Sequence, residues 1–521
     1  MKHIFTLVFA FSLAVCLHAQ TVLSGDITNN TTLLAVNRYL LDGTVFVKNN
    51  VTLTIEPGTV ILGKKSSTRP ALVITRGAKI VANGTFTKPI VFTSDQAAGQ
   101  RNPGDWGGII ILGKAVVNTP TGEFAIEGLP SSTDATCGGN DDADNSGVLR
   151  YVRIEFPGIA FAPNIEINGL TMGAVGSGTI IDNVQVSYSG DDSFEWFGGT
   201  VNCKHLVAYK GLDDDFDTDY GYRGKIQYAV ALRDPALADV SGSNGFESDN
   251  NAAGAYTPVR TQPVFANVTL VGPKATRTTT VSNNFKRAAH IRRASQLNVF
   301  NSILMAYPDG ILMDGAKVCT AATGDSVKVK GVILACDTNL RTNVSSFNAA
   351  NWFNTAAYNN TQITTQNNRA DVMLTDPFNA AAPNWLPMAG SPALSGGVAT
   401  TDPFFEATTF RGAFGTVNWT AEWTQFNPIN YTNVGTKELE GMHTPLNMYP
   451  NPAQNQLNIS FVGYKYSQTN IEITNVLGAA VYQQAVEVQA GKNTFEVSIA
   501  ALNPGLYFVK IDGKVGRLVV R

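Results

Sequence analysis

The sequence predicts an all-β protein in which a long solenoid of stacked short strands precedes a small β-sandwich. Charged residues make up only 15% of the 521 residues, and the chain holds 48 glycines. Low charge combined with many glycines and β-branched residues suits stacked strands and tight turns better than helices. No long segment shows the apolar spacing of an amphipathic helix, whereas short alternating apolar and polar runs recur along the chain.

Residues 1–19 have the pattern of a secretory signal peptide. Lys2 precedes an apolar run from Ile4 to Leu17, and Ala19 places a small residue just before the expected cleavage site. The run is too short for a membrane span, and no other stretch approaches about 18 consecutive apolar residues. We therefore expect an exported chain without a transmembrane segment. Removing Lys2 changes the formal charge from −3 to −4, which is too mild to indicate a nucleic-acid partner.

Residues 20–395 form the predicted solenoid, because a unit of about 20 to 30 residues recurs there. Each early unit combines a short strand, a glycine-containing bend and another short strand. These units are Val51–Val60, Leu72–Ile80, Pro89–Ser94 and Gly104–Ile109. The series resembles the opening coils of right-handed parallel β-helix proteins of the pectate-lyase-like superfamily. That resemblance implies parallel strands stacked coil upon coil.

The middle units align on pairs of residues spaced two apart, which places both side chains on one face of a strand. A recurrence near 22 residues would stack these pairs into an interior ladder, because each coil covers the apolar face of the last. The pairs are Val186 with Tyr188, Val207 with Tyr209, Val230 with Leu232, Val268 with Leu270, and Val332 with Leu334. We therefore predict that these residues belong to the core and not to a site.

Residues 396–444 are predicted to be a C-terminal cap followed by a linker. The preceding segment, 386–394, resembles the closing segment common in such β-helices. The stretch from Phe404 to Phe426 carries Trp419 and Trp423, and it would suit a cap over the exposed last coil, whose edge is otherwise unpaired. The residues from about 427 to 444 are predicted to be the linker in which processing occurs.

Residues 445–521 form a compact all-β pattern that indicates the destination of the chain. Short alternating runs broken by Gly, Asn and Pro predict antiparallel strands of a small immunoglobulin-like sandwich. The segment opens with Tyr-Pro-Asn-Pro at 449–452, contains Gly-Leu-Tyr-Phe-Val at 505–509 and ends in a basic, apolar terminus. This combination closely resembles the type A sorting domain of the type IX secretion system of the Bacteroidota type. The resemblance implies export across the outer membrane by that machinery, removal of the domain, and attachment to surface lipopolysaccharide or release outside the cell.

Four cysteines remain after the signal peptide, namely Cys137, Cys203, Cys319 and Cys336. An even number in an exported chain permits two disulfides. Cys319 and Cys336 flank one Gly-Asp turn and one short strand, so we predict a disulfide between them, with four buried free thiols as the alternative. No Cys-x-x-Cys occurs and histidine is scarce, which argues against zinc.

Two acidic motifs one coil apart form the candidate site. Asp191-Asp192-Ser193-Phe194-Glu195 is followed 22 residues later by Asp213-Asp214-Asp215-Phe216-Asp217, and 243–247 carries a third copy that ends in Phe246-Glu247. This offset predicts an aromatic stack of Phe194, Phe216 and Phe246 and a row of carboxylates at Glu195, Asp217 and Glu247, with Asp219 and Asp249 close by. Like charges spaced by about 5 Å repel, so they need a cation, a hydrogen-bond donor or a raised pKa.

Three interpretations of the acidic motifs stay open. The first is a bound calcium ion, because several carboxylates can supply its six to eight oxygen ligands. Its predicted ligands are Asp191, Asp192, Glu195, Asp213, Asp215, Asp217 and Glu247. In the second, turn amides and nearby Arg223, Arg233 or Lys210 satisfy the carboxylates. In the third, paired acids hydrolyse a glycosidic bond.

Catalysis has no motif in support. The polygalacturonase-like members of the resembled superfamily carry Asn-Thr-Asp, Gly-His-Gly and Arg-Ile-Lys signatures, and none occurs here. Lyase members pair calcium with an Arg or Lys base, for which Lys210, Arg223 and Lys225 are candidates by proximity only. No catalytic residue can therefore be carried over. The basic run 286–293 would either contact an anionic glycan or pair with the acidic row, and we favour pairing. His290 within this run lacks an evident partner.

These features together predict a secreted β-helix protein attached to the cell surface. Its predicted role is non-enzymatic glycan binding or adhesion. The alternative is a polysaccharide lyase or glycoside hydrolase that acts on an extracellular polysaccharide. A base and an acid that converge on one point in a groove would favour the enzyme, whereas sealed carboxylates over a flat sheet would favour binding.

Overall fold

The computed structural model describes residues 20–66, 68, 70–162, 165–431, 446–463, 467–475, 479–489, 491–511 and 514–521. The expected signal peptide and most of the expected linker lie outside these residues. The described chain is almost entirely β-structure, which confirms the predicted fold class. Helices are short: α1 (Ala316–Thr323), α2 (Ala349–Phe353), and the 3-10 turns Thr133–Ala135, Ala356–Tyr358, Ala370–Val372 and Pro392–Leu394. None of the described helices has the length and apolar character that a membrane span needs.

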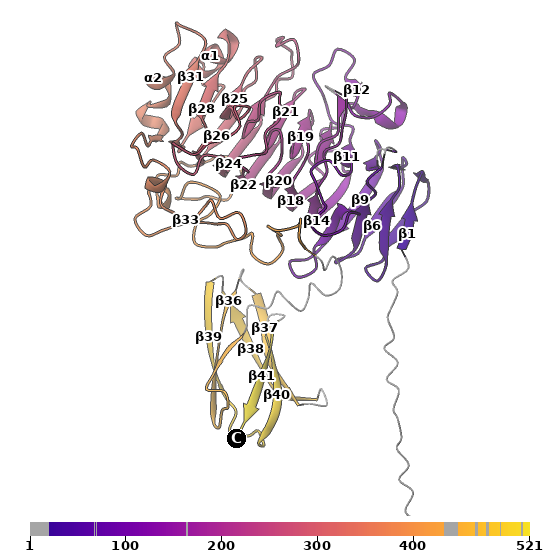
Figure 1. Cartoon of the computed structure of the whole chain (residues 1–521), viewed down its shortest axis with the longest axis vertical. Helices are drawn as coiled ribbons and strands as arrows, with labels where there is room; N and C mark the ends of the chain where they lie inside the picture. The colour runs from indigo at the N-terminus through magenta and orange to yellow at the C-terminus, as the bar shows by residue number, and fades with distance from the viewer. Residues whose placement is uncertain are drawn as a thin grey trace, which may run out of the picture.

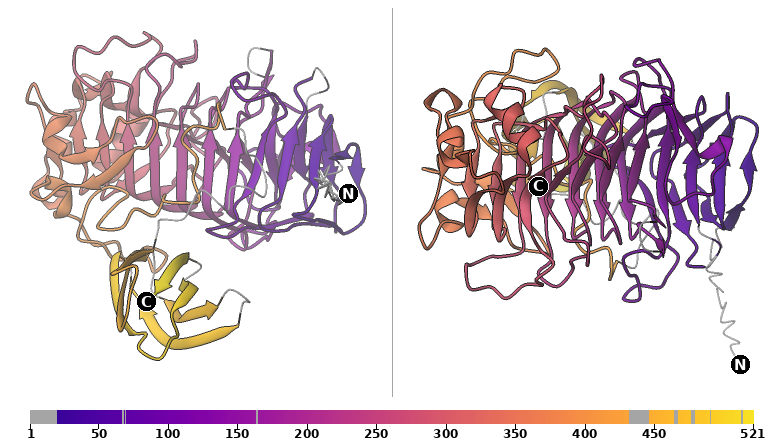
Figure 2. Two further views of the ribbon diagram at one scale, coloured as in Figure 1. Left: turned by 60° about the horizontal axis from the view of Figure 1, so that its bottom comes forward. Right: turned by 90° about the horizontal axis from the view of Figure 1, so that it is seen from above.

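Two long parallel sheets build the solenoid (Figures 1 and 2). The larger contains β1 (Gln20–Leu23), β3 (Thr31–Leu33), β4 (Arg38–Leu41), β6 (Thr52–Ile55), β7 (Val60–Gly63), β9 (Lys79–Asn83), β10 (Ile90–Ser94), β14 (Gly147–Glu155), β18 (Ile180–Ser187), β20 (Asn202–Tyr209), β22 (Lys225–Leu232), β24 (Val264–Val271), β26 (Asn298–Phe300), β27 (Ile303–Met305), β29 (Val329–Lys330), β30 (Ile333–Ala335) and β32 (Thr361–Gln362). The smaller contains β2 (Asp26–Ile27), β5 (Thr44–Val47), β8 (Ala71–Ile74), β11 (Gly108–Leu112), β17 (Leu170–Gly173), β19 (Phe194–Phe197), β21 (Phe216–Asp219), β23 (Phe246–Ser248), β25 (Arg287–Ile291), β28 (Asp309–Met313) and β31 (Thr338–Thr342). Short antiparallel pairs in the loops join β12 (Glu123–Ala125) to β13 (Thr136–Gly138), β15 (Ala160–Ala162) to β16 (Ile165–Glu166), and β33 (Leu374–Asp376) to β34 (Asn384–Pro387).

The larger sheet bends along a column of left-handed residues, so it covers two sides of each coil. Asn183, His205, Tyr228 and Asn267 have φ between 54° and 64°. Each interrupts its strand at the same level, because pairing skips these residues while their neighbours stay in register. Asparagine tolerates this conformation better than most residues, which explains its recurrence in the column. The bend gives the parallel β-helix a three-sided coil.

The interior ladder is confirmed for half of its predicted members. Val186, Val268, Leu270, Val332 and Leu334 lie in the main core. Tyr188, Val207, Tyr209, Val230 and Leu232 instead point outward into a second apolar cluster. The reason is register: Val207 pairs with Gln185, and Ala208 is the residue that stacks on Val186. A shift of one residue turns a side chain to the other face of the sheet.

The predicted cap over the last coil is wrong. Residues 396–431, which we name the strap, run back along the outside of the β-helix, from the last coils toward the first (Figure 1, orange). Their aromatic side chains cover the second apolar cluster. The last coil is instead covered by α2, whose Trp352 and Phe353 pack on the main core. Aromatic content alone signals burial, and it does not say which surface is buried.

The predicted disulfide between Cys319 and Cys336 is not formed, and all four described cysteines are buried free thiols. Cys319 lies in α1, where its Sγ is 3.6 Å from Thr342 Oγ1. Cys336 follows β30 and donates to the carbonyl of Leu304 on the preceding coil, over 3.6 Å. Burial raises the pKa of Cys336 to about 12, so this thiol is unreactive.

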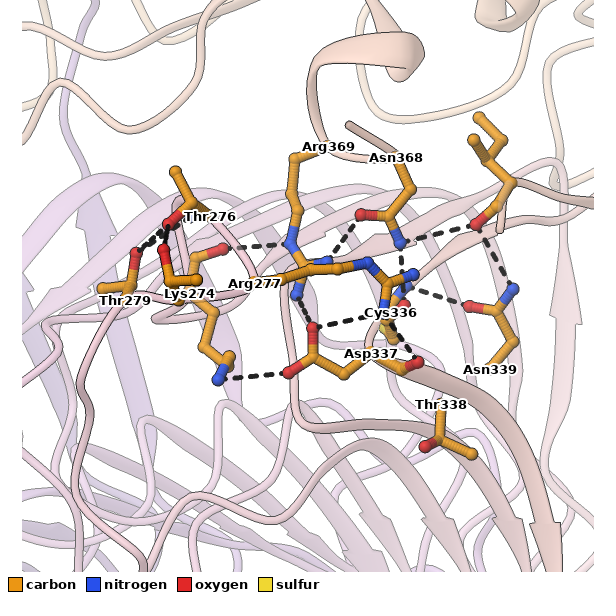
Figure 3. A network of polar contacts seen from close by, with 12 residues as sticks. Lys274, Thr276, Arg277, Thr279, Cys336, Asp337, Thr338, Asn339, Asn368 and Arg369 are labelled. Atoms are coloured by element: carbon orange, nitrogen blue, oxygen red, sulfur yellow. Dashed lines mark hydrogen bonds and ion pairs between the residues drawn. The ribbon is translucent and has the colours of Figure 1, made fainter. Parts of the chain in front are cut away.

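A polar network fixes the chain around Cys336 (Figure 3). Asn339 Oδ1 accepts from the Cys336 N–H over 2.9 Å, and Asn368 Nδ2 donates to the Cys336 carbonyl over 2.7 Å. Asp337 pairs with Arg369 at 2.5 Å and with Lys274 at 3.1 Å. The backbone of Cys336 is thus held from both sides, with its thiol turned toward Leu304 and away from Cys319.

The C-terminal domain is a separate antiparallel sandwich, as predicted. One sheet contains β35 (Asn447–Tyr449), β36 (Gln456–Gly463) and β39 (Gly491–Ser498). The other contains β38 (Ala480–Val488), β37 (Ser467–Asn475), β40 (Gly505–Ile511) and β41 (Lys514–Val520). Its core includes Leu457, Ile471, Val497 and Val509, and it has no member from the β-helix.

Candidate functional site

Three neighbouring strands of the smaller sheet bring the acidic motifs together. Glu195 on β19 lies beside Asp217 on β21, which lies beside Glu247 on β23. Because side chains alternate along a strand, the preceding phenylalanines point inward while the acids point outward. The rings of Phe194 and Phe216 are 5.7 Å apart, as are those of Phe216 and Phe246. The offset of 22 residues therefore predicted both rows correctly.

The turns that precede β19 and β21 add further carboxylates to this row. Asp192 Oδ1 accepts from the backbone N–H of Asp214 over 2.8 Å, and Asp214 Oδ1 accepts from the N–H of Asn244. Each acid thus caps the turn of the following coil. Asp214 was missing from the predicted ligands, although it occupies the same place in its motif as Asp192. The coil offset, applied to every residue of the motif, would have found it.

The carboxylates form three overlapping groups of the size that a metal ion needs. Within each group, the possible ligand atoms all lie within 4.8 Å of one another. The groups are Asp191–Asp192–Asp213, Asp192–Glu195–Asp217 and Asp214–Asp217–Glu247. Asp192 and Asp217 are shared, so the groups join into one line, which we name the acidic row. Six of the seven predicted ligands belong to it, together with Asp214.

Asp215 does not belong to the acidic row. Its buried carboxylate is 3.2 Å from Arg233 Nε and accepts from the Tyr307 hydroxyl over 3.0 Å. Arg233 also donates to the Gly211 carbonyl over 2.9 Å. Burial raises the pKa of Asp215 to about 7, although the Arg233 charge opposes the shift. This residue is therefore part of a buried ion pair that fixes the corner of the coil.

Burial and mutual repulsion keep the acidic row from ionising freely. Both causes, with burial the larger, raise the pKa of most of its members well above the ordinary value. These members are Asp191, Asp192, Glu195, Asp214 and Asp217. Burial likewise raises the pKa of Asp213 to about 6, although a bond from Ser241 opposes the shift. Asp213 Oδ1 and Asp217 Oδ1 are buried without a hydrogen-bond partner among the described residues. The row therefore needs protons or a cation.

One end of the acidic row is neutralised by the basic run 286–293, as the favoured interpretation of that run predicted. The run forms β25, the next strand of the sheet. Arg292 contacts Glu247 and is 2.8 Å from Asp249, which also lies 2.8 Å from Arg293. Although burial opposes it, the His290 and Arg292 contacts lower the pKa of Glu247.

The other cations that the sequence offered lie elsewhere. Lys210 pairs with Asp234 at 3.0 Å, Arg223 with Asp142 at 3.0 Å and Lys225 with Asp402 at 2.5 Å. These three residues were the candidates for a lyase base, and each is engaged by an acid outside the acidic row. Asn168 Nδ2, which sequence reasoning missed, donates to Glu195.

His290 has a partner that sequence reasoning missed. Its Nε2 is 2.8 Å from Asp314 Oδ2, while its Nδ1 is 3.1 Å from Arg287 Nη1 and 3.4 Å from Glu247 Oε2. Asp314 follows β28, one coil onward, so the coil offset again held the signal. A carboxylate that orients an imidazole is one part of a general acid–base arrangement.

A loop next to the acidic row presents an exposed aromatic ring with two cations. Tyr256 is 53% exposed, and its ring centroid lies 4.0 Å from the Arg260 guanidinium carbon and 4.8 Å from Lys317 Nζ. Neither cation has an ion-pair partner among the residues that the structure describes. Buried Asn250 shapes the loop by donating to the Ala255 carbonyl over 2.7 Å. We name Tyr256, Arg260 and Lys317 the cationic patch.

A family model for the pectate-lyase-like β-helix domain matches residues 25–424. A model for a secretion-system C-terminal sorting domain matches residues 447–521. None of the curated proteins compared with the chain matches it. The first match covers more than half of the chain, and both the acidic row and the cationic patch lie within it.

Proposed function

Because this chain belongs to the pectate-lyase-like β-helix family, we propose that its β-helix binds calcium and an anionic extracellular glycan without cleaving the glycan. The sorting domain indicates export by the type IX secretion machinery to the cell surface or the medium. The signal peptide at 1–19, attachment to surface lipopolysaccharide and a role in adhesion are parts of this proposal. The fold alone does not specify an activity, so the support comes from the site.

The acidic row is the observation that carries the proposal. Its three overlapping groups offer carboxylate oxygens at the spacing that a hard cation requires. Oxygens of Asp213 and Asp217 are buried without a partner, and an unpaired buried carboxylate is costly. A bound cation would remove both the desolvation penalty and the repulsion between neighbours. The six to eight oxygen ligands of calcium suit a line of carboxylates with room for water.

The cationic patch supports the glycan part of the proposal. Arg260 and Lys317 flank one exposed ring and have no acidic partner among the described residues. Two cations held close together favour an anionic group, such as the carboxylate or sulfate of a sugar. The patch adjoins Asp249 and Arg293 at the end of the acidic row, since Gly254 of its loop packs against Arg293. A bound chain could therefore contact the patch and the calcium together.

The glycan part is tested by binding of purified residues 20–440 to dextran sulfate, polygalacturonate and uncharged dextran in calcium. We expect binding to the charged polymers only, with at least about tenfold weaker binding for Arg260→Gln combined with Lys317→Gln. Lys88→Gln is the matched control, because Lys88 is an exposed lysine far from the patch in sequence and outside any described ion pair. Equal binding by the double variant and the wild type would remove the patch from the proposal.

A polysaccharide lyase or hydrolase is the second candidate. It is favoured by one observation, the orientation of His290 by Asp314 beside Glu247. The same polymers, incubated with the protein in calcium, are assayed for unsaturated products and new reducing ends. Products that disappear in His290→Gln would establish the enzyme. Binding without products would favour the non-enzymatic function.

A further inference from the structure

The strap joins coils that are far apart in the β-helix. Near its start, the backbone of Val398 donates to Asn301 Oδ1 over 2.7 Å and accepts from Asn301 Nδ2 over 2.9 Å. At its end, Arg101 Nη1 donates to the carbonyls of Pro428 and Tyr431 over 2.7 and 3.1 Å. Asn301 precedes β27, whereas Arg101 follows β10. The strap thus follows the lower side of the stack in Figure 1 from late coils to early ones.

Side-chain amides of the coils hold the middle of the strap as a neighbouring strand would. Gln227 accepts from the N–H of Glu406 over 2.8 Å and donates to its carbonyl over 2.9 Å. Gln185 makes the same two bonds with Gln425, each 2.8 Å long. Both glutamines are fully buried. Because an amide carries a donor and an acceptor together, it satisfies both groups of one strap residue.

Aromatic packing adds to these bonds along the same path. Trp423 is fully buried, and its ring meets that of Tyr151 with centroids 5.9 Å apart. Trp419 meets His205 edge-on at 5.1 Å and stacks on Phe414 at 5.1 Å. Such contacts place large apolar side chains over coils that are not neighbours. The strap and the outward faces of the coils therefore share one core.

We propose that the strap makes the β-helix a single cooperative unit. In a solenoid without such a segment, each coil contacts only its neighbours, so the ends open independently of one another. Here, opening of the first coils exposes the end of the strap, and opening of the last coils exposes its beginning. Release at either end removes bonds and aromatic cover from the coils between them. The strap thereby transmits stability from one end of the stack to the other.

Gly412 offers a way to detach the strap at one defined place. Its N–H donates to the Asn301 carbonyl over 2.7 Å, and its φ is +91°. A Cβ at this position would lie 2.6 Å from Ile303 Cδ1 and 2.8 Å from Thr269 Oγ1. Gly412→Val therefore combines a forbidden backbone conformation with a clash at the late coils. Gly315 has nearly the same φ, +94°, and open space around its Cβ, so Gly315→Val is the matched control.

Hydrogen–deuterium exchange of the full chain tests the proposal, because it reports local opening in each segment. In Gly412→Val we expect exchange at least about tenfold faster both in β27–β30 and in the distant strands β4, β7 and β10. In Gly315→Val we expect faster exchange around β28 and α1 only. Unchanged exchange in β4, β7 and β10 of Gly412→Val would overturn the proposal.

A milder variant covers the case in which Gly412→Val does not fold. Gln185→Ala removes both bonds to Gln425 in the middle of the strap and leaves the backbone conformation of the strap allowed. We expect faster exchange in β10 on one side and in β27 on the other. Faster exchange confined to β14, β18 and β20 would mean that coils respond only to their neighbours, and the proposal would fail.

Discussion

Two outward surfaces of the β-helix follow the same rule of stacking and differ in what covers them. On one, strands β19, β21 and β23 align carboxylates into the acidic row. On the other, β18, β20 and β22 align apolar residues, among them Val207 and Val230, which the strap covers. In Figure 1 the first surface lies toward the upper side of the stack and the second toward the strap.

The difference shows that one repeat can produce an unconditional and a conditional surface. The apolar surface is completed by the chain itself, so its stability needs no other partner. The acidic row contains buried carboxylates whose charge the described residues neutralise only at the Glu247 end. Its stability therefore depends on pH and, under our proposal, on calcium. Substitutions and solution conditions that act on one surface should leave the other unchanged.

The largest expected effect is that of a charge beneath the strap. Val207 is 1% exposed, so Val207→Asp would bury a carboxylate among aromatic and aliphatic side chains. We expect a loss of about 3–5 kcal/mol in the free energy of unfolding and a midpoint lower by roughly 5 °C or more. Thermal unfolding followed by circular dichroism measures this change.

Ile180→Asp is the control for this substitution. Ile180 lies on the neighbouring strand β18 but is 42% exposed, so the new carboxylate stays hydrated. We expect its midpoint to differ from the wild type by less than about 2 °C. If Val207→Asp were as harmless as Ile180→Asp, the strap could not cover Val207 in solution.

The rows of the smaller sheet could be predicted from the sequence because its strands keep a constant offset. Phe194 and Phe216 are 22 residues apart, and one turn of the chain separates them. The larger sheet could not be treated in the same way. Its strands bend at left-handed residues such as His205, so a pair spaced two apart does not reveal whether it lies inside or outside. Val186 and Val207 differ by 21 residues and lie on opposite faces.

Contacts made by turns and by the strap also escaped sequence reasoning. Asp214 and Asp215 are adjacent in sequence, yet one joins the acidic row and the other pairs with Arg233. That division depends on the course of a turn, for which the sequence has no periodic signal. The strap was placed at the wrong surface for a related reason. Trp423 indicates burial, but only the fold shows that Tyr151 lies beneath it.

The second effect in size is that of calcium on the acidic row. Calcium bound only by the folded state would stabilise it by about 2.7 kcal/mol at a concentration a hundredfold above Kd. Thermal midpoints of the protein in excess calcium and in chelator measure this difference. Asp217→Asn should reduce it, because Asp217 belongs to two of the three carboxylate groups. Asp215→Asn should retain it, since Asp215 faces Arg233. Identical midpoints in the two buffers would eliminate calcium as a ligand.

A smaller effect is expected from pH in the absence of metal. Burial and repulsion raise the pKa of acids in and beside the row, to about 6 for Asp213 and about 7 for Asp219. The folded state therefore binds protons more tightly than the unfolded chain, and unfolding releases protons. The free energy of unfolding should fall as the pH rises from about 4 to 7, apart from a small opposite contribution from Glu247.

Urea unfolding in chelator at pH 5 and pH 7.5 measures this slope. Saturating calcium should flatten or reverse it, because the cation competes with protons for the same oxygens. Asp217→Asn should also lessen the slope by removing one raised pKa and one repelling neighbour. A midpoint that rises with pH in chelator would contradict the raised values.

The smallest effect on the β-helix is expected from removing the sorting domain. Deleting residues 445–521 removes a sandwich whose core has no member from the β-helix. It also removes Lys514, which lies 3.5 Å from Glu422 of the strap, and a single such pair contributes at most about 1 kcal/mol. We therefore expect the thermal midpoint of the β-helix to stay within about 2 °C of that of the full chain. In the cell, the same deletion should retain the protein in the periplasm, because the signal for export is lost. Fractionation and protease treatment of intact cells measure that outcome. A normal melt with normal surface display would show that residues outside 445–521 direct export, whereas a collapsed melt would show that the strap needs the sorting domain in place.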